Sequence, residues 1–105
     1  VSYVTPLNRI NFKPQVLKTR ETTSNVSVVH FYKSGDGVSQ NIAPEFDSWT
    51  NNFQNLFKIG AVDCDENVVI CEQEKIKTFP TFRIYPPTPM PIIDMEGEVE
   101  IKKLQ

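Results

Sequence analysis

The stretch Val26 to Glu45, VSVVHFYKSGDGVSQNIAPE, decides the predicted fold of this chain. Five of its first seven residues are valine, phenylalanine or tyrosine and give a run that is apolar on both faces, which is typical of a central strand in a sheet covered by helices. A short polar loop follows, and a helix is predicted to begin near Ser39. This order often forms a functional site, because the first N–H groups of the helix point into the loop and the helix dipole favours negative charge there.

Size and charge exclude several classes of function. The 105 residues fit one domain, 1–105, and a hydrophobic content of 39% is enough for one core and too high for disorder. The formal net charge is -2 with both signs interspersed, so we expect no binding to nucleic acid or to a membrane surface. No run approaches the roughly 20 apolar residues that a membrane span needs. Because the chain begins at Val1, we expect a domain excised from a longer protein.

Strands and helices are predicted to alternate along most of the chain. Strands separated by helices pair in parallel through right-handed crossovers, and two final strands joined by a short link pair antiparallel. The prediction is therefore a mixed sheet between helix layers. The expected strands are Tyr3 to Thr5, Val26 to Tyr32, Ile59 to Val62, Thr81 to Tyr85 and Ile92 to Met95, and the expected helices start at Asn11, Ser39, Val68 and Glu98.

Local signals refine these elements. Pro6 is expected to end the first strand, and Asn11 is expected to cap the first helix. Pro44 should kink the long helix, because its ring meets the carbonyl four residues earlier. Val69 is expected to face the core with Ile70. The proline-rich link Pro86 to Pro91 favours extended polyproline II segments.

Together these segments resemble the thioredoxin fold in the form found in protein disulfide isomerases. The resemblance covers Val4 to Leu104, and it implies an α/β fold with a mixed sheet of about five strands between helices. It rests on Leu7 to Phe12, Val26 to Glu45, Ile59 to Cys71, Thr78 to Tyr85 and the turn at Gly97.

The resemblance also defines where redox chemistry would lie. The positions at which the family carries Cys-x-x-Cys hold Asp36 and Ser39, and the position of the family's buried acid holds His30. A carboxylate cannot undergo thiol–disulfide exchange. We therefore expect a redox-inactive domain lacking the Cys-x-x-Cys pair, in which Asp36 or Ser39 caps the helix and His30 is a core residue.

Phe79-Pro80 resembles the cis-proline loop of the family, where an extended substrate peptide pairs with the backbone like an added strand. The implied function is binding of unfolded or extended polypeptide, as a chaperone or docking module. The implied surface comprises Gly35, Asp36, Gly37, Val38, Phe79, Pro80 and Thr81. The alternative is a purely structural turn.

Cys64 and Cys71 are the only cysteines. In one helix their Cα atoms would lie about 10 Å apart, too far for a bridge, whereas a bridge is feasible if Cys64 ends the preceding strand. The resemblance implies a structural, non-catalytic disulfide at this spacing, and two separately buried thiols are the alternative. Two cysteines and His30 are too few ligands for zinc, and no metal or cofactor is expected.

The resemblance implies the endoplasmic reticulum lumen or secretory pathway. The sequon Asn25-Val26-Ser27, a candidate for N-glycosylation at Asn25, gives weak support. Two other readings stay open. The domain could be a subordinate part of a disulfide isomerase whose Cys-x-x-Cys lies elsewhere, or a structural or adaptor domain that binds a partner protein.

Overall fold

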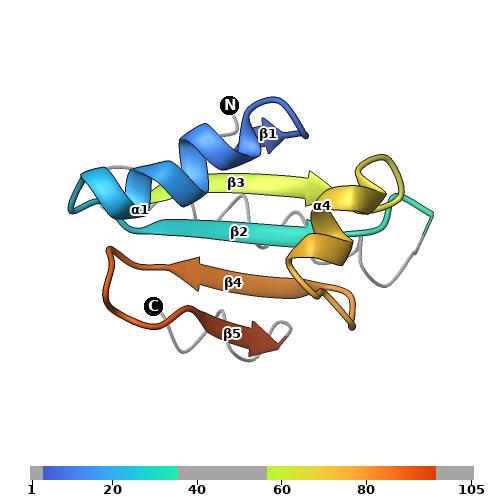
Figure 1. Cartoon of the computed structure of the whole chain (residues 1–105). Helices are drawn as coiled ribbons and strands as arrows, with labels where there is room; N and C mark the ends of the chain where they lie inside the picture. Colours follow the sequence, from blue (N-terminus) through green and yellow to red (C-terminus); the bar gives the residue numbers. More distant parts are fainter. Residues whose placement is uncertain (1–3, 36–56, 97–105) are drawn as a thin grey trace.

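A computed structural model of the chain describes residues 4–35 and 57–96, and its centre is a five-stranded sheet (Figure 1). The strands lie in the order β1-β3-β2-β4-β5. The β1·β3 and β2·β3 pairs are parallel, and the β2·β4 and β4·β5 pairs are antiparallel. The strands are β1 (Thr5–Leu7), β2 (Ser27–Tyr32), β3 (Lys58–Asp63), β4 (Thr81–Tyr85) and β5 (Ile93–Glu96). The predicted α/β thioredoxin fold with a mixed sheet is confirmed.

Strand β2 occupies the centre because both of its faces are apolar. Val28 and His30 point to one face and Val29 and Phe31 to the other, and all four side chains are at most 2% exposed. A central strand of this kind has neighbours on both edges, so all its backbone groups can pair. Strands β3 and β4 supply that pairing.

Three short helical segments cover one face of the sheet, namely η1 (Lys13–Leu17), α1 (Lys18–Thr22) and α4 (Val68–Gln73). The first is a π-helix that continues directly into α1, and α1 and α4 lie over the same face in Figure 1. The predicted inward residues Phe12 and Val16 are buried, and Leu17 packs against the core. The core on this face contains Leu7, Phe12, Val16, Val29, Phe31, Val62, Cys64, Ile70, Cys71 and Tyr85.

The first strand and first helix begin at other residues than predicted. Pro6 lies inside β1, where it is tolerated because β1 is an edge strand and needs hydrogen bonds on one side only. The predicted cap at Asn11 is also wrong. The side chain of Asn8 accepts hydrogen bonds from the N–H groups of Ile10 (2.8 Å) and Asn11 (3.1 Å), which is the pattern of an N-cap one turn earlier.

Helix α4 presents a different face to the core than predicted. Ile70 is 5% exposed as expected, but Val69 is 61% exposed. Cys71 takes the inward position instead, because its sulfur is bonded to Cys64 at the end of β3. That covalent bond fixes how the short helix is turned.

The proline-rich link is a tight turn and not an extended segment. The Met90 N–H donates to the Pro87 carbonyl at 3.0 Å, and α1 holds both sides of the turn. The Arg20 guanidinium donates to the carbonyls of Pro86 (2.9 Å) and Met90 (2.7 Å), while the Thr88 N–H donates back to the Arg20 carbonyl at 2.8 Å. These long-range hydrogen bonds outweigh the local preference of proline for polyproline II. The predicted helices from Ser39 and Glu98, the kink at Pro44 and the turn at Gly97 lie outside the described residues.

Candidate functional site

Two loops meet at the end of the sheet where β2 finishes and β4 begins. Their meeting follows from the antiparallel β2·β4 register, which pairs Phe31 with Thr81. The Lys33 ammonium lies 4.7 Å from the centroid of the Phe79 ring, a cation–π contact between the two loops. Lys33 is exposed and Phe79 is half-buried, so the contact forms part of the molecular surface.

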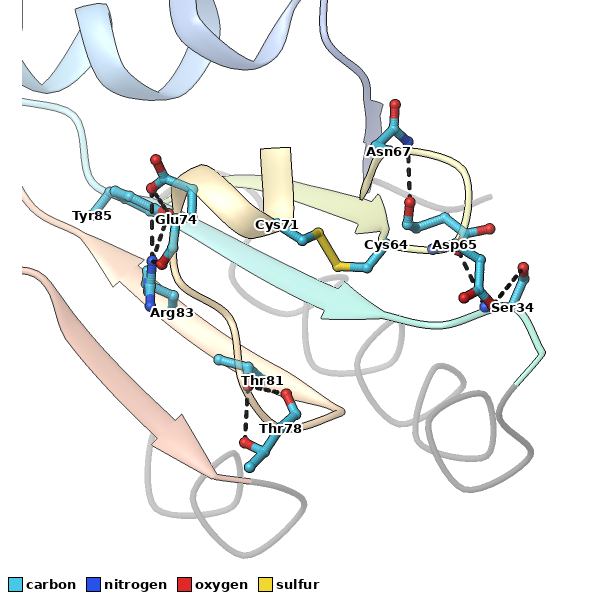
Figure 2. Close-up of a disulfide and its surroundings, with 11 residues drawn as sticks. Ser34, Cys64, Asp65, Asn67, Cys71, Glu74, Thr78, Thr81, Arg83 and Tyr85 are labelled. Atoms are coloured by element: carbon cyan, nitrogen blue, oxygen red, sulfur yellow. Dashed lines mark hydrogen bonds and ion pairs between the residues drawn. A yellow bond between two sulfur atoms is a disulfide. The ribbon is translucent and has the colours of Figure 1, made fainter. Parts of the chain in front are cut away.

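The loop after β2 is held by two aspartates that sequence reasoning did not assign to the site. The Gly35 N–H donates to Asp65 Oδ2 at 2.9 Å, and the Ser34 N–H donates to Asp63 Oδ1 at 3.2 Å. Ser34 and Asp65 lie together beyond the ends of β2 and β3 in Figure 2. Parallel pairing of these strands brings their carboxyl ends side by side, and this was the signal that could have identified the aspartates.

The segment before β4 contains a cis peptide bond and an internal hydrogen bond. The Phe79–Pro80 peptide bond is cis, as the resemblance implied. The Thr81 hydroxyl donates to the Thr78 carbonyl at 2.6 Å (Figure 2). The side chain of Thr81 is also buried, so it contributes to the fold and not to the surface. Within the described part of the chain, the N–H groups of Thr78 and Phe79 donate no hydrogen bond.

Of the other predicted surface residues, Gly35 is exposed in the loop that Asp65 holds. Asp36, Gly37, Val38 and Ser39 lie outside the described residues. The predicted helix cap at Asp36 or Ser39 therefore stays a prediction.

Cys64 and Cys71 form a disulfide with a Cα–Cα distance of 5.8 Å, so the expected bridge is confirmed. Figure 2 shows it between the end of β3 and α4, above the sheet. Each cysteine is 5% exposed, and both belong to the core cluster with Phe12, Val62 and Ile70. An attacking thiolate has to reach one sulfur directly, and burial restricts that approach.

This bridge corrects the description of the chain as a disulfide-isomerase-type domain that lacks the Cys-x-x-Cys pair. That description compared only the positions of Asp36 and Ser39 with the family's Cys-x-x-Cys, and treated the expected Cys64–Cys71 bridge as a separate structural feature. The chain does carry a cysteine pair, closed as a disulfide over a sequence separation of seven. Cys64 and Cys71 are thus the pair on which any account of redox behaviour has to be based.

His30 is a core residue in the structure. It is 2% exposed, its ring stacks on Phe82 at 4.5 Å between centroids, and Tyr32 lies 5.2 Å away. Burial lowers the pKa of His30 from 6.5 to about 4, so the imidazole is neutral near pH 7. These contacts agree with the structural interpretation of this histidine.

A polar network fixes the segment that leads to Pro80. Arg83 binds the Asp94 carboxylate through two nitrogens and donates to the Glu74 carbonyl at 2.7 Å. The Tyr85 hydroxyl donates to Glu74 Oε1 at 2.6 Å (Figure 2). Burial, followed by the hydrogen bond to Glu74, raises the pKa of Tyr85. Sequence reasoning missed this network, because its members are ordinary strand and helix residues until the fold brings them together.

Other predicted features lie away from these loops. Asn25 is exposed just before β2, at the opposite end of that strand. Among the described residues, no group of three His, Cys, Asp or Glu side chains is arranged to hold a metal ion. No helix in residues 4–35 or 57–96 is long and apolar enough to cross a membrane.

Comparisons with known proteins agree with this geometry. A protein of Dictyostelium discoideum that bears a protein disulfide-isomerase name is 35% identical over 88 residues, which is 84% of this chain and 20% of that protein. The human DnaJ homolog subfamily C member 10 is 32% identical over 81 residues, 77% of this chain and 10% of that protein. A mitochondrial thioredoxin domain-containing protein of Schizosaccharomyces pombe is 30% identical over 105 residues, covering 94% of this chain and 28% of that protein.

The chain thus spans between 10% and 28% of the length of these relatives. Among solved structures, full-length ERdj5 superposes with a TM-score of 0.84 at 26% identity, over 97% of this chain and 15% of that chain. The family model described as Thioredoxin matches residues 3–105. With its β1-β3-β2-β4-β5 sheet and the cis peptide bond before Pro80, the chain belongs to the thioredoxin family.

Proposed function

We propose that this domain binds unfolded or extended polypeptide at the end of the sheet formed by Lys33, Gly35, Phe79 and Pro80. One observation carries the proposal: the Lys33–Phe79 contact joins two loops into a single surface next to open backbone groups. An extended peptide can pair with such backbone groups as an added strand, which requires no particular side-chain sequence.

The half-buried ring of Phe79 supplies an apolar contact beside this backbone. Phe79 packs against the core cluster, so its position is fixed before a peptide arrives. A preorganised contact loses less conformational entropy on binding than a mobile one. Pro80 donates no N–H, so the groups open to pairing are those of Thr78 and Phe79.

The domain is proposed to bind without exchanging disulfides. Both cysteines are buried in the core, and exchange requires a thiolate to attack an accessible sulfur. A buried bridge between β3 and α4 acts instead as a structural cross-link. In an insulin reduction assay with dithiol, the domain should show no activity above that of the Cys64→Ala/Cys71→Ala variant.

The endoplasmic reticulum lumen or another secretory compartment is the proposed location. A closed disulfide persists in oxidising compartments and is rare where glutathione keeps thiols reduced. The disulfide-isomerase names among the relatives support the same compartment, although one relative is mitochondrial by name.

The length of the relatives favours a second candidate. Because the chain spans only 20% of the Dictyostelium protein, it would fit a subordinate domain of a longer disulfide isomerase that presents substrate to a catalytic pair elsewhere. The sequence on either side of this domain decides between the two, since a neighbouring Cys-x-x-Cys would identify the subordinate role. An adaptor role predicts instead one stoichiometric folded partner and no affinity for unfolded chains.

Chemical-shift mapping tests the binding surface. Titration with a reduced and alkylated unfolded polypeptide should shift the amides of Lys33, Thr78 and Phe79. The amides of Arg20 and Thr88, at the other end of the sheet, serve as internal controls and should not move. Shifts confined to the Arg20 end, or none at either end, would refute peptide binding at this surface.

A further inference from the structure

We propose that Asn25 is an N-glycosylation site, occupied while the chain is still extended. The inference rests on the proposed secretory location. It concerns a modification site at the end of the sheet remote from the proposed peptide surface.

Asn25 is the single asparagine of the chain in the N-x-[ST] pattern, through Asn25-Val26-Ser27. It also differs physically from the other asparagines that the structure describes. The side chains of Asn8, Asn11 and Asn67 all make hydrogen bonds to the backbone. The Asn25 side chain is exposed and makes no hydrogen bond within the described residues, so the fold does not use its amide.

The local structure around Asn25 tolerates a large substituent. The residue lies between the end of α1 at Thr22 and the start of β2 at Ser27. Its backbone N–H donates to the Thr23 hydroxyl at 3.1 Å. A glycan on an exposed loop of this kind projects into solvent and displaces no packed side chain.

The burial of Ser27 determines when transfer takes place. The acceptor pattern requires the hydroxyl of the third residue, and in the folded domain Ser27 is 3% exposed within β2. An enzyme cannot reach that hydroxyl once β2 has paired with β3 and β4. The acceptor is therefore the extended chain, and the folded domain is not a substrate.

The donor in this transfer step is a polyprenyl-diphosphate-linked oligosaccharide. The bond between the sugar anomeric carbon and the diphosphate oxygen breaks, and a bond from that carbon to Asn25 Nδ2 forms. The polyprenyl diphosphate leaves with the electron pair, and the amide nitrogen loses one proton to a base of the transferase. No oxidation or reduction is involved.

The position of the glycan is compatible with the proposed peptide site. Asn25 precedes β2 and Lys33 follows it, and the six residues of β2 that lie between them span about 20 Å at about 3.3 Å each. A glycan at Asn25 therefore leaves the Lys33–Phe79 surface open. The glycan would lie instead over the end of the sheet where Arg20 binds the β4–β5 turn.

The test uses the full chain fused to a secretory leader and recovered from the medium of eukaryotic cells. We expect a shift in gel mobility that an endoglycosidase removes, and conversion of Asn25 to Asp in the tryptic peptide after enzymatic release. Asn25→Gln and Ser27→Ala should each abolish the shift. Ser24→Ala, a change at an exposed neighbouring residue that leaves the sequon intact, should retain it.

Secreted protein with unmodified Asn25 would overturn the proposal, and so would a shift that survives both substitutions. A separate measurement tests whether glycosylation precedes folding. Microsomes should glycosylate the reduced and alkylated chain but not the folded domain, and modification of the folded domain would contradict the argument from Ser27. Because secretion is imposed by the leader, failure here is distinct from failure of peptide binding, which the unglycosylated bacterial protein tests.

Discussion

The two ends of the sheet differ in how fully their backbone groups are used. At one end, Arg20 and Thr88 join α1 to the β4–β5 turn through hydrogen bonds in both directions. At the other end, aspartates hold the loop around Gly35, but the N–H groups of Thr78 and Phe79 donate no bond within the described residues. Among the described residues, one end therefore has its turn closed by hydrogen bonds, and the other, called the open end below, has two N–H groups without an internal acceptor.

The difference indicates that exposed backbone near Phe79 is not a general feature of this fold's loops. The turn after β4 contains prolines as well, yet its carbonyls are bound by a guanidinium. Water can satisfy the exposed N–H groups near Phe79 in the free domain, and the backbone of a bound strand could replace that water. The open end is therefore the better candidate for function.

Both ends depend on one core, and acidification gives the largest expected test of that dependence. His30 has a folded pKa of about 4 against 6.5 when unfolded, so the unfolded chain binds more protons between these values. The contribution of His30 to the free energy of unfolding is therefore fully present above pH 6.5. It falls by about 3 kcal/mol as the pH is lowered towards 4. Urea unfolding at stepwise pH measures this loss.

The control for this prediction is His30→Leu, which removes the titrating group. Its free energy of unfolding should fall much less between pH 6.5 and 4. Hydrogen exchange should show amides at both ends losing protection together in the wild type. An equal slope in the variant, or loss of protection at one end only, would contradict the shared-core interpretation.

The disulfide stabilises the open end, and its removal gives the next largest effect. The loop from Cys64 to Cys71 is short, so Cys64→Ala/Cys71→Ala should lower the free energy of unfolding by about 2 to 3 kcal/mol. Denaturant unfolding measures the loss, with Val68→Ala on the exposed face of α4 as control. Chemical shifts should change near Asp65 and Ser34 more than near Thr88. The reverse distribution would show that the bridge supports the sheet generally.

Much of the sheet could be predicted from the sequence, since strand signals are local. The β-branched and aromatic run from Thr81 to Tyr85 gave its strand correctly, and the run before Lys33 gave the central strand to within one residue. Pro6 misled the prediction because a proline ends a central strand but not an edge strand. Which strand is the edge is a property of the topology.

The site was less accessible from sequence, because its contacts join distant residues. Asp65 holds Gly35 across a separation of 30, and Arg20 binds Pro86 across 66. No local pattern marks either pair. The family resemblance implied a bridge between Cys64 and Cys71, but the description of the redox site rested on Asp36 and Ser39 and left this buried pair out.

Opening the closed end should reduce stability without affecting peptide binding. Arg20→Met keeps the apolar stem of the side chain but removes its hydrogen bonds to Pro86 and Met90. We expect a loss of about 1 to 2 kcal/mol in the free energy of unfolding. Lys18→Met, on an exposed position of the same helix, is the control and should be nearly neutral. Weaker binding of unfolded polypeptide by the Arg20 variant would remove the functional distinction between the ends.

The smallest change in stability, and the sharpest test of function, is expected at Lys33. Lys33→Glu removes an exposed cation–π contact with Phe79, so stability should change by only about 0.5 to 1 kcal/mol. Affinity for an unfolded polypeptide should fall about two- to fivefold, as the same energy implies when the contact shapes the binding surface. Lys13→Glu makes the same charge change on an exposed residue of η1, away from Phe79. If both variants weaken binding equally in a fluorescence titration, net charge explains the effect. A loss confined to Lys33→Glu means that the peptide meets the open end of the sheet.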